Sequence, residues 1–431
     1  MEKQLIHTPE GVRDIYDAEC RQKLRVQEEI LNTLYLYGYQ HVETPSFEFF
    51  DIFNKERGSV SSREMFKFFD RDNNTLVLKP DMTPAIARCV SKYFFEETMP
   101  IRLCYLERTF TNNTSYQGRL KEVTQTGAEM IGDDSSDADA EMIALVIDCL
   151  RSAGLKEFQV ELGQVEFFRG LVEEAGMDEE TRGRLLEMIE NKNFFGVEEI
   201  LHENPVGPEL LEVFLRLPEL FGSIERIRAA RELTDNPRAL FAIERLEKVH
   251  AILENYGLSE YVSYDLGMLS KYQYYTGIIF KAYTYGTGDY VVTGGRYDKL
   301  LEQFGKRAAA VGFGIAVDQL LLALARQGIS LLTKKRDVMV LFDVPARVAA
   351  VSLAKRLRER GIPVQFQRRH QTPGMDDYLQ MAVRGGLSRL IYVYGEGERA
   401  VVYTLPGMET EEADTSQIDE RIVNCMDGCG A

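Results

Sequence analysis

The segment LKEVTQTGAEMI at residues 120–131 combines apolar residues with an alternation of apolar and polar residues, which is typical of a strand. The segment before it, IRLCYLERT at 101–109, has the same character. Shorter segments of this kind lie at 65–69, 75–79 and 157–162. Because several strands follow one another with few helices between them, we expect an antiparallel sheet.

Helical patterns lie on both sides of these strands. A helix is predicted over residues 17–37, with Gly38 as its C-cap. Between residues 165 and 256, apolar residues recur at three-and-four spacing, which predicts a helical insertion. The sheet then resumes with strands and ends in a long helix, at 261–266, 278–283, 290–293 and 310–326.

Two domains are expected. The first, residues 1–330, holds an antiparallel sheet flanked by helices, which makes it an α+β fold with a helical insertion at about 165–256. The second, residues 336–431, follows the linker LLTKKR and alternates the strands DVMVLFDV, PVQFQ and RLIYVYG with helices near 348–360 and 376–384. It is therefore predicted to be a small C-terminal α/β domain.

The composition is that of a globular protein. A chain of 431 residues with 45% hydrophobic content can bury a large core. Charged residues make up 28% and no apolar run is long enough to span a membrane, so we expect a soluble, cytoplasmic protein without membrane contact. The net charge of −17 argues against tight nucleic-acid binding over the surface as a whole.

Neither the cysteines nor the histidines indicate a metal or a cofactor. The 6 cysteines are scattered, which favours reduced thiols over a disulfide framework. Only Cys425 and Cys429 lie close together, and no second pair or histidine stands near them at the spacing of metal ligands. The 5 histidines show no metal-ligand spacing. We therefore expect no metal site and no cofactor.

Seven segments of the chain carry motifs. In order, they are HTPEGVRD at 7–14, YGYQHVETPSFE at 37–48, LVLKPDMTPAIAR at 76–88, QGRLKEVTQTGAEMIG at 117–132, YQYYTGIIF at 272–280, GGRYDKL at 294–300 and AVGFGIAVDQL at 310–320. In these segments the chain resembles class II histidyl-tRNA synthetases and their paralogues from end to end. Seven ordered matches are far more specific than a lone glycine-rich loop. The resemblance implies a class II aminoacyl-tRNA synthetase-like fold, with a C-terminal domain like the anticodon-binding domain.

The resemblance also identifies three positions at which a synthetase carries a catalytic or phosphate-binding arginine. This chain has Thr111 at the end of the first strand of motif 2, Gln319 in motif 3, and Ser270 four residues before Tyr274. None of these side chains can supply the bidentate guanidinium that clamps a phosphate. Because each loss is worth about 2 to 4 kcal/mol of transition-state stabilisation, we expect no aminoacylation activity.

The positions that would bind histidine are retained. By the resemblance, Asp81 pairs with the α-ammonium group and Gln125 hydrogen-bonds to the same end of the ligand, while Glu129 and Tyr275 reach the imidazole and Tyr297 closes the pocket. Carboxylates and phenols suit imidazole, because one ring nitrogen needs an acceptor and the other needs a group that can donate or accept.

The contact to the ligand carboxylate and the roles of single residues stay open at this point. Ser270 cannot hold a carboxylate ionically, and Lys271 or Arg119 are the candidates to replace it. Asp81 can instead cap the helix that begins near Thr83, and the polar residues of the 120–131 strand can simply pair across the sheet. If residues 272–275 form a strand, Tyr272 and Tyr274 point to one face and Tyr275 to the other.

Together these features predict a non-catalytic protein that senses histidine. Within the resembled family, this is the regulatory subunit of ATP phosphoribosyltransferase, a glycosyltransferase complex that performs the first step of histidine biosynthesis. The expected partners are the short-form catalytic subunit, a second copy of the chain through motif 1 around Pro45, and L-histidine as a feedback effector; tRNA is not expected. Two alternatives are a divergent histidyl-tRNA synthetase, to which the C-terminal domain points, and a free-standing histidine-binding adaptor.

Overall fold

The computed structural model describes residues 6–53, 60–98, 100–113, 120–204, 206–269, 274–331 and 337–419. The chain divides into two compact units, Met1–Leu331 and Leu332–Ala431. Among the described residues, no helix is both long enough and apolar enough to cross a membrane.

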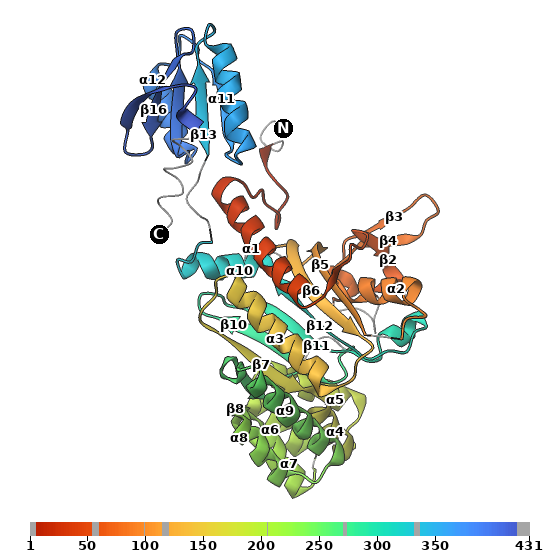
Figure 1. Ribbon diagram of the computed structural model, residues 1–431. Helices are drawn as coiled ribbons and strands as arrows, with labels where there is room; N and C mark the ends of the chain where they lie inside the picture. The colour runs from red at the N-terminus through yellow and green to blue at the C-terminus, as the bar shows by residue number, and fades with distance from the viewer. Residues whose placement is uncertain are drawn as a thin grey trace. The chain divides into compact units, whose positions relative to one another are not determined.

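A nine-stranded sheet forms the centre of the larger unit (Figure 1). Its neighbouring strands are antiparallel, except for the parallel pairs β1–β5 and β7–β9, which confirms the expected antiparallel sheet. In spatial order the strands are β1 (Gln40–His41), β5 (Ile101–Phe110), β6 (Glu122–Ile131), β12 (Ala310–Ala316), β11 (Val292–Arg296), β10 (Ile278–Thr284), β7 (Phe158–Gln164), β9 (Val262–Asp265) and β8 (Phe221–Gly222).

Strand β12 corrects one prediction. The long helix expected at 310–326 is wrong for its first seven residues, which form β12, and only Val317–Arg326 is helical, as α10. The strand lies between β6 and β11 and pairs with both. Its glycines, Gly312 and Gly314, weaken a helix, and pairing on both sides satisfies the backbone of the strand. The alternation of Val311, Phe313 and Ile315 with small residues is itself a strand pattern, and the helix begins only after it.

The two faces of the sheet have different surroundings. One face packs under helices α1 (Asp17–Leu36), α3 (Ser136–Ser152) and α10, and Figure 1 shows α1 and α3 lying across it. From β6, Ala128 and Met130 enter this core. Since side chains alternate along a strand, Glu129 points to the opposite face. That second face carries a smaller buried cluster, which includes Tyr105 and Tyr275.

Helix α2 and a small sheet stand beside this second face. The helix is α2 (Thr83–Tyr93), and its buried residues Ile86 and Val90, with Met82 at its N-cap, join the cluster that contains Tyr105. The small sheet has the order β2 (Phe47–Phe49), β4 (Thr75–Leu78) and β3 (Lys67–Phe69). The loop from β4 to α2 therefore delivers residues 79–82 to the second face.

The segment between β7 and β9 is largely helical, and the caps of its helices can be read from the sequence. Asp178 accepts a hydrogen bond from the amide of Thr181, and Asn236 accepts from the amides of Arg238 and Ala239. The helices are α4 (Val165–Ala175), α5 (Glu179–Glu190), α6 (Phe194–Glu203), α7 (Pro208–Arg216), α8 (Ile224–Ala229) and α9 (Pro237–Asn255). We call this segment, 165–256, the insertion.

The smaller unit holds a five-stranded sheet. Strands β14, β13 and β15 are parallel neighbours, β16 pairs antiparallel with β15, and β17 pairs antiparallel with β16. The predicted alternation therefore describes the unit only as far as β15. Its elements are β13 (Val338–Phe342), α11 (Arg347–Glu359), β14 (Val364–Arg368), α12 (Met375–Arg384), β15 (Arg389–Val393), β16 (Arg399–Thr404) and β17 (Glu409–Asp414). This confirms a small C-terminal α/β fold.

Candidate functional site

Glycines of β12 form a floor on the second face of the sheet, over which side chains of the neighbouring strand β6 lie. Gly312 lies opposite Glu129 of β6 on one side and Gly295 of β11 on the other. A Cβ atom at Gly312 would lie 1.6 Å from Glu129 Oε2, and one at Gly314 would lie 1.9 Å from Gln125 Nε2. The side chains of Gln125 and Glu129 therefore lie directly over positions that must lack a side chain.

Glu129 is buried in this floor, with 1% of its surface exposed. The hydroxyl of Thr83 donates to Oε1 over 2.8 Å, and the hydroxyl of Tyr297 donates to Oε2. Burial raises the pKa of Glu129 to about 8, the nearby Asp81 adds to the rise, and the two hydroxyl groups oppose it. A cation beside Glu129 would therefore stabilise its charged form.

Asp81 lies at the start of α2 and is also buried. Its Oδ1 accepts a hydrogen bond from the amide of Met82 over 2.7 Å, and its Oδ2 accepts from the hydroxyl of Tyr274 over 3.2 Å. Met82, and not Asp81, is the N-cap residue of α2, and its side chain makes no capping hydrogen bond, so the structure does not give Asp81 the capping role. The contact with Tyr274 places the Asp81 carboxylate beside the buried tyrosines.

Three buried tyrosines surround the two carboxyl groups. The ring centroids of Tyr274 and Tyr275 lie 4.9 Å apart, and those of Tyr274 and Tyr297 lie 5.9 Å apart. Gly295 makes room for Tyr275, because a Cβ atom there would lie 2.8 Å from its ring. Residues 274–277 precede β10 and are not a strand, so the alternation expected for a strand does not apply to Tyr274 and Tyr275, and both join one buried cluster. Tyr272 lies outside the described residues.

These contacts define what we call the pocket: Asp81, Glu129, Tyr274, Tyr275 and Tyr297. Gln125 lies on the same face of β6, four residues along the strand, and is half-buried. Two carboxyl groups beside phenols offer acceptors and donors to a small ligand with N–H groups and a positive charge. The pocket is therefore suited to recognition of such a ligand.

Three residues in or near the pocket were given no role there from the sequence. Thr83 and Tyr274 lie inside quoted motifs, so membership of a motif was the available signal for them. Arg169 comes from α4 of the insertion, and its Nη2 donates to the main-chain oxygen of Tyr275 over 2.9 Å. That contact joins positions separated by 106 residues, which no local pattern indicates.

Of the remaining predicted residues, Arg119, Ser270 and Lys271 lie outside the described residues. Thr111 follows the last residue of β5, where its amide donates to the carbonyl of Lys121 over 2.9 Å. Gln319 is half-buried in the first turn of α10, which follows β12 directly. Both positions lie past the Gln125 end of β6 and β12.

Two lysines toward this end of the sheet already face carboxylates. The fully buried Lys79 donates to Glu107 Oε2 over 2.9 Å and to the carbonyl of Thr44 over 3.0 Å. Lys23 pairs with Asp318 over 2.9 Å. These ion pairs offset the lysine charges that a polyphosphate would need. Within the described part of the chain, no group of three or more His, Cys, Asp or Glu residues could hold a metal ion.

Comparison with known proteins gives one family for most of the chain. A family model described as histidyl-tRNA synthetase matches residues 11–320. A protein of Ruminiclostridium cellulolyticum named ATP phosphoribosyltransferase regulatory subunit is 40% identical over 412 residues, which cover 96% of this chain and 98% of that protein. A protein of the same name from Clostridium kluyveri is 42% identical over 363 residues, covering 84% and 93%.

Solved structures agree with this assignment. A structure from Bacillus halodurans, described as an ATP phosphoribosyltransferase regulatory subunit/histidyl-tRNA synthetase, is 31% identical, has a TM-score of 0.81, and matches over 91% of this chain and 99% of that one. A histidyl-tRNA synthetase from Nostoc has a TM-score of 0.80 over 97% and 99% of the two chains, but only 19% identity. The second likeness concerns the fold alone, and it confirms the predicted class II fold.

The floor of the pocket can be tested by Gly312→Ala. The new methyl group would overlap the Glu129 carboxylate, so we expect a loss of about 1 to 3 kcal/mol in the free energy of unfolding, as for other overpacked sites. Urea unfolding measures the change. Gly183→Ala in α5 is the matched control, because nothing lies within 4 Å of a Cβ there, and it should be neutral or slightly stabilising. Equal stability of the Gly312 variant and the wild type would contradict the packing described.

The raised pKa of Glu129 predicts a pH dependence of stability. Between its ordinary value of 4.5 and about 8, the folded protein holds a proton that the unfolded chain has lost. Stability should therefore fall as pH rises through this window. Glu129→Gln is neutral at every pH, so its urea midpoint should fall less steeply from pH 5 to pH 8 than that of the wild type. Parallel curves for the two proteins would show that Glu129 is ionised throughout.

Proposed function

The chain belongs to the family of ATP phosphoribosyltransferase regulatory subunits, within the histidyl-tRNA synthetase family, and from this premise we propose that it is a non-catalytic subunit that binds histidine and controls a catalytic partner. The partner would be an ATP phosphoribosyltransferase catalytic subunit, which places the protein in histidine biosynthesis. A second copy of the chain would complete a homodimer within the larger complex.

The observation that carries the proposal is a contrast between the pocket and the positions past the end of β6 and β12. The pocket keeps two buried carboxyl groups and three tyrosines in mutual contact. The phosphate positions hold Thr111 and Gln319, which carry no charge, and the nearby Lys79 is engaged by Glu107. A synthetase must stabilise developing charge on ATP phosphates with preorganised cations. A sensor of an amino acid has no such need.

The chemistry of the pocket suits histidine in particular. The ligand's α-ammonium group would pair with Asp81, whose Oδ2 already accepts from Tyr274. Its imidazole would reach Glu129 and the hydroxyls of Tyr275 and Tyr297. A protonated imidazole or an ammonium group beside Glu129 would offset the repulsion from Asp81 that helps raise the pKa of Glu129. Ligand binding would thus favour loss of the Glu129 proton and pair the resulting carboxylate with a positive charge.

The competing function is that of a divergent histidyl-tRNA synthetase, to which the C-terminal unit points. One assay separates the two. The purified protein is mixed with a short-form ATP phosphoribosyltransferase catalytic subunit, and formation of phosphoribosyl-ATP is followed with and without histidine. We expect activity to depend on the mixture and to fall with histidine. Histidine-dependent exchange of pyrophosphate into ATP by this protein alone would instead establish a synthetase.

The pocket itself is tested by calorimetric titration of histidine into the protein without a partner. Asp81→Asn and Tyr297→Phe each remove one interaction of the pocket, so both should weaken histidine binding at least about ten-fold, the usual loss for a hydrogen bond to a charged group. Tyr285→Phe is the control, since Tyr285 is 76% exposed and lies outside the pocket. Unchanged affinity in both pocket variants would place histidine elsewhere.

A further inference from the structure

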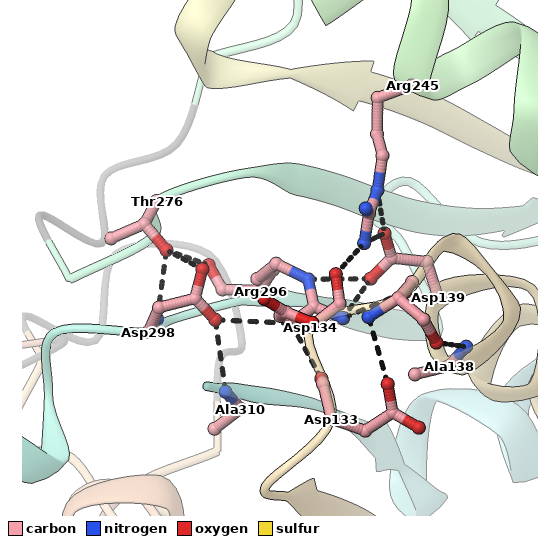
Figure 2. A network of polar contacts seen from close by, with 10 residues as sticks. Asp133, Asp134, Ala138, Asp139, Arg245, Thr276, Arg296, Asp298 and Ala310 are labelled. Carbon is pink, nitrogen blue, oxygen red and sulfur yellow. Dashed lines mark hydrogen bonds and ion pairs between the residues drawn. The ribbon is translucent and has the colours of Figure 1, made fainter. Parts of the chain in front are cut away.

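A buried network of ion pairs lies next to the pocket, and its residues have no role in the function proposed above (Figure 2). At its centre is Asp139 of α3, which has no exposed surface. Arg296 donates to Asp139 Oδ1 over 2.8 Å, and Arg245 donates to Oδ2 over 2.8 Å. Burial raises the pKa of the Asp139 carboxyl, and the two guanidinium groups oppose this rise. Each carboxylate oxygen therefore has its own arginine.

Arg296 connects this network to the pocket through the backbone. It directly precedes Tyr297, and its main-chain oxygen accepts from the amide of Thr276, the residue after Tyr275, over 2.7 Å. Its side chain also donates to Asp298 over 3.2 Å, and Asp298 in turn accepts from the hydroxyl of Thr276 over 3.2 Å. The hydrogen bond between Thr276 and Arg296, which we call the latch, thus joins the residue after Tyr275 to the residue before Tyr297.

Arg245 brings the insertion into the same network. It lies on α9, and besides Asp139 it donates to the carbonyl of Asp134 over 2.7 Å, just before α3. If Arg245 is removed, Asp139 keeps only one of its two partners while remaining buried. A buried carboxylate that loses a partner must rearrange or gain water. Arg296 is the other partner of Asp139, so we expect its side chain to shift with the carboxylate.

We propose that Asp139, Arg245 and Arg296 are positioning residues, through which docking of the insertion onto the sheet fixes the placement of Tyr275 and Tyr297. This inference rests on the proposed function, since the expected effect is a change in the affinity for histidine. It differs from a purely structural role. A structural ion pair changes the free energy of unfolding alone, whereas a positioning network also changes the pocket of the folded protein.

The test compares Arg245→Met, Arg245→Lys and a control, Arg231→Met. Arg231 also belongs to the insertion and pairs with a carboxylate of α9, Glu247, but it is 40% exposed. Calorimetry should show histidine binding about ten-fold weaker in Arg245→Met, by analogy with the loss when an outer-shell partner of a bound ion is removed. Arg245→Lys should recover part of the affinity, and Arg231→Met should bind as the wild type does.

A second readout does not require histidine. Protein labelled with 3-fluorotyrosine should give ¹⁹F resonances of Tyr275 and Tyr297, assigned by Tyr→Phe substitution, that shift in Arg245→Met and not in Arg231→Met. Unshifted resonances together with wild-type affinity, even at lower stability, would overturn the positioning role. Failure of the wild type to bind histidine would overturn the proposed function, while the ¹⁹F shifts would still decide whether Arg245 positions the tyrosines.

Discussion

The pocket depends on close packing across strands that lack side chains where their neighbours need room. Strands of a sheet lie only about 4.8 Å apart, so a side chain that leans over the next strand needs a glycine beneath it. Gly312 provides this room for Glu129, and Gly295 provides it for Tyr275. On its opposite face the same strand, β12, fills the main core with Val311, Phe313 and Ile315. One strand therefore anchors the fold on one side and shapes the pocket on the other.

Two buried carboxyl groups in this unit, those of Asp139 and Glu129, are stabilised in different ways. The difference distinguishes a group that supports the fold from a group suited to binding a ligand. Asp139 is held by two guanidinium groups that match its charge. Glu129 is held by two hydroxyls, which donate hydrogen bonds but bring no charge, and Asp81 lies near it. The first arrangement is complete without a ligand. The second arrangement supplies no positive charge, so a cationic ligand would stabilise the ionised form of Glu129.

The sequence predicted the sheet, the insertion and the main pocket residues because these depend on local patterns or on motifs. Strand composition identified β5 and β6, and three-and-four spacing identified the insertion. The strand character of Ala310–Ala316 was missed although Val311, Phe313 and Ile315 alternate there with glycines, and pairing with β6 and β11 bears this pattern out. Arg169 and Arg245 were missed for a different reason. Each acts across more than a hundred positions of sequence, and a single chain holds no local sign of such contacts.

A sensor differs from an enzyme in what it must do with the energy of ligand binding. An enzyme uses that energy at the reacting atoms, whereas a sensor must change a surface that another chain reads. A pocket whose residues all lay on the sheet would have no direct connection to another part of the surface. Here the tyrosines that surround the carboxyl groups share a backbone latch with Arg296, and Arg245 ties that latch to α9. If placement of the insertion and of the tyrosines is one equilibrium, linkage requires that histidine and a partner bound to the insertion change each other's affinity by the same factor.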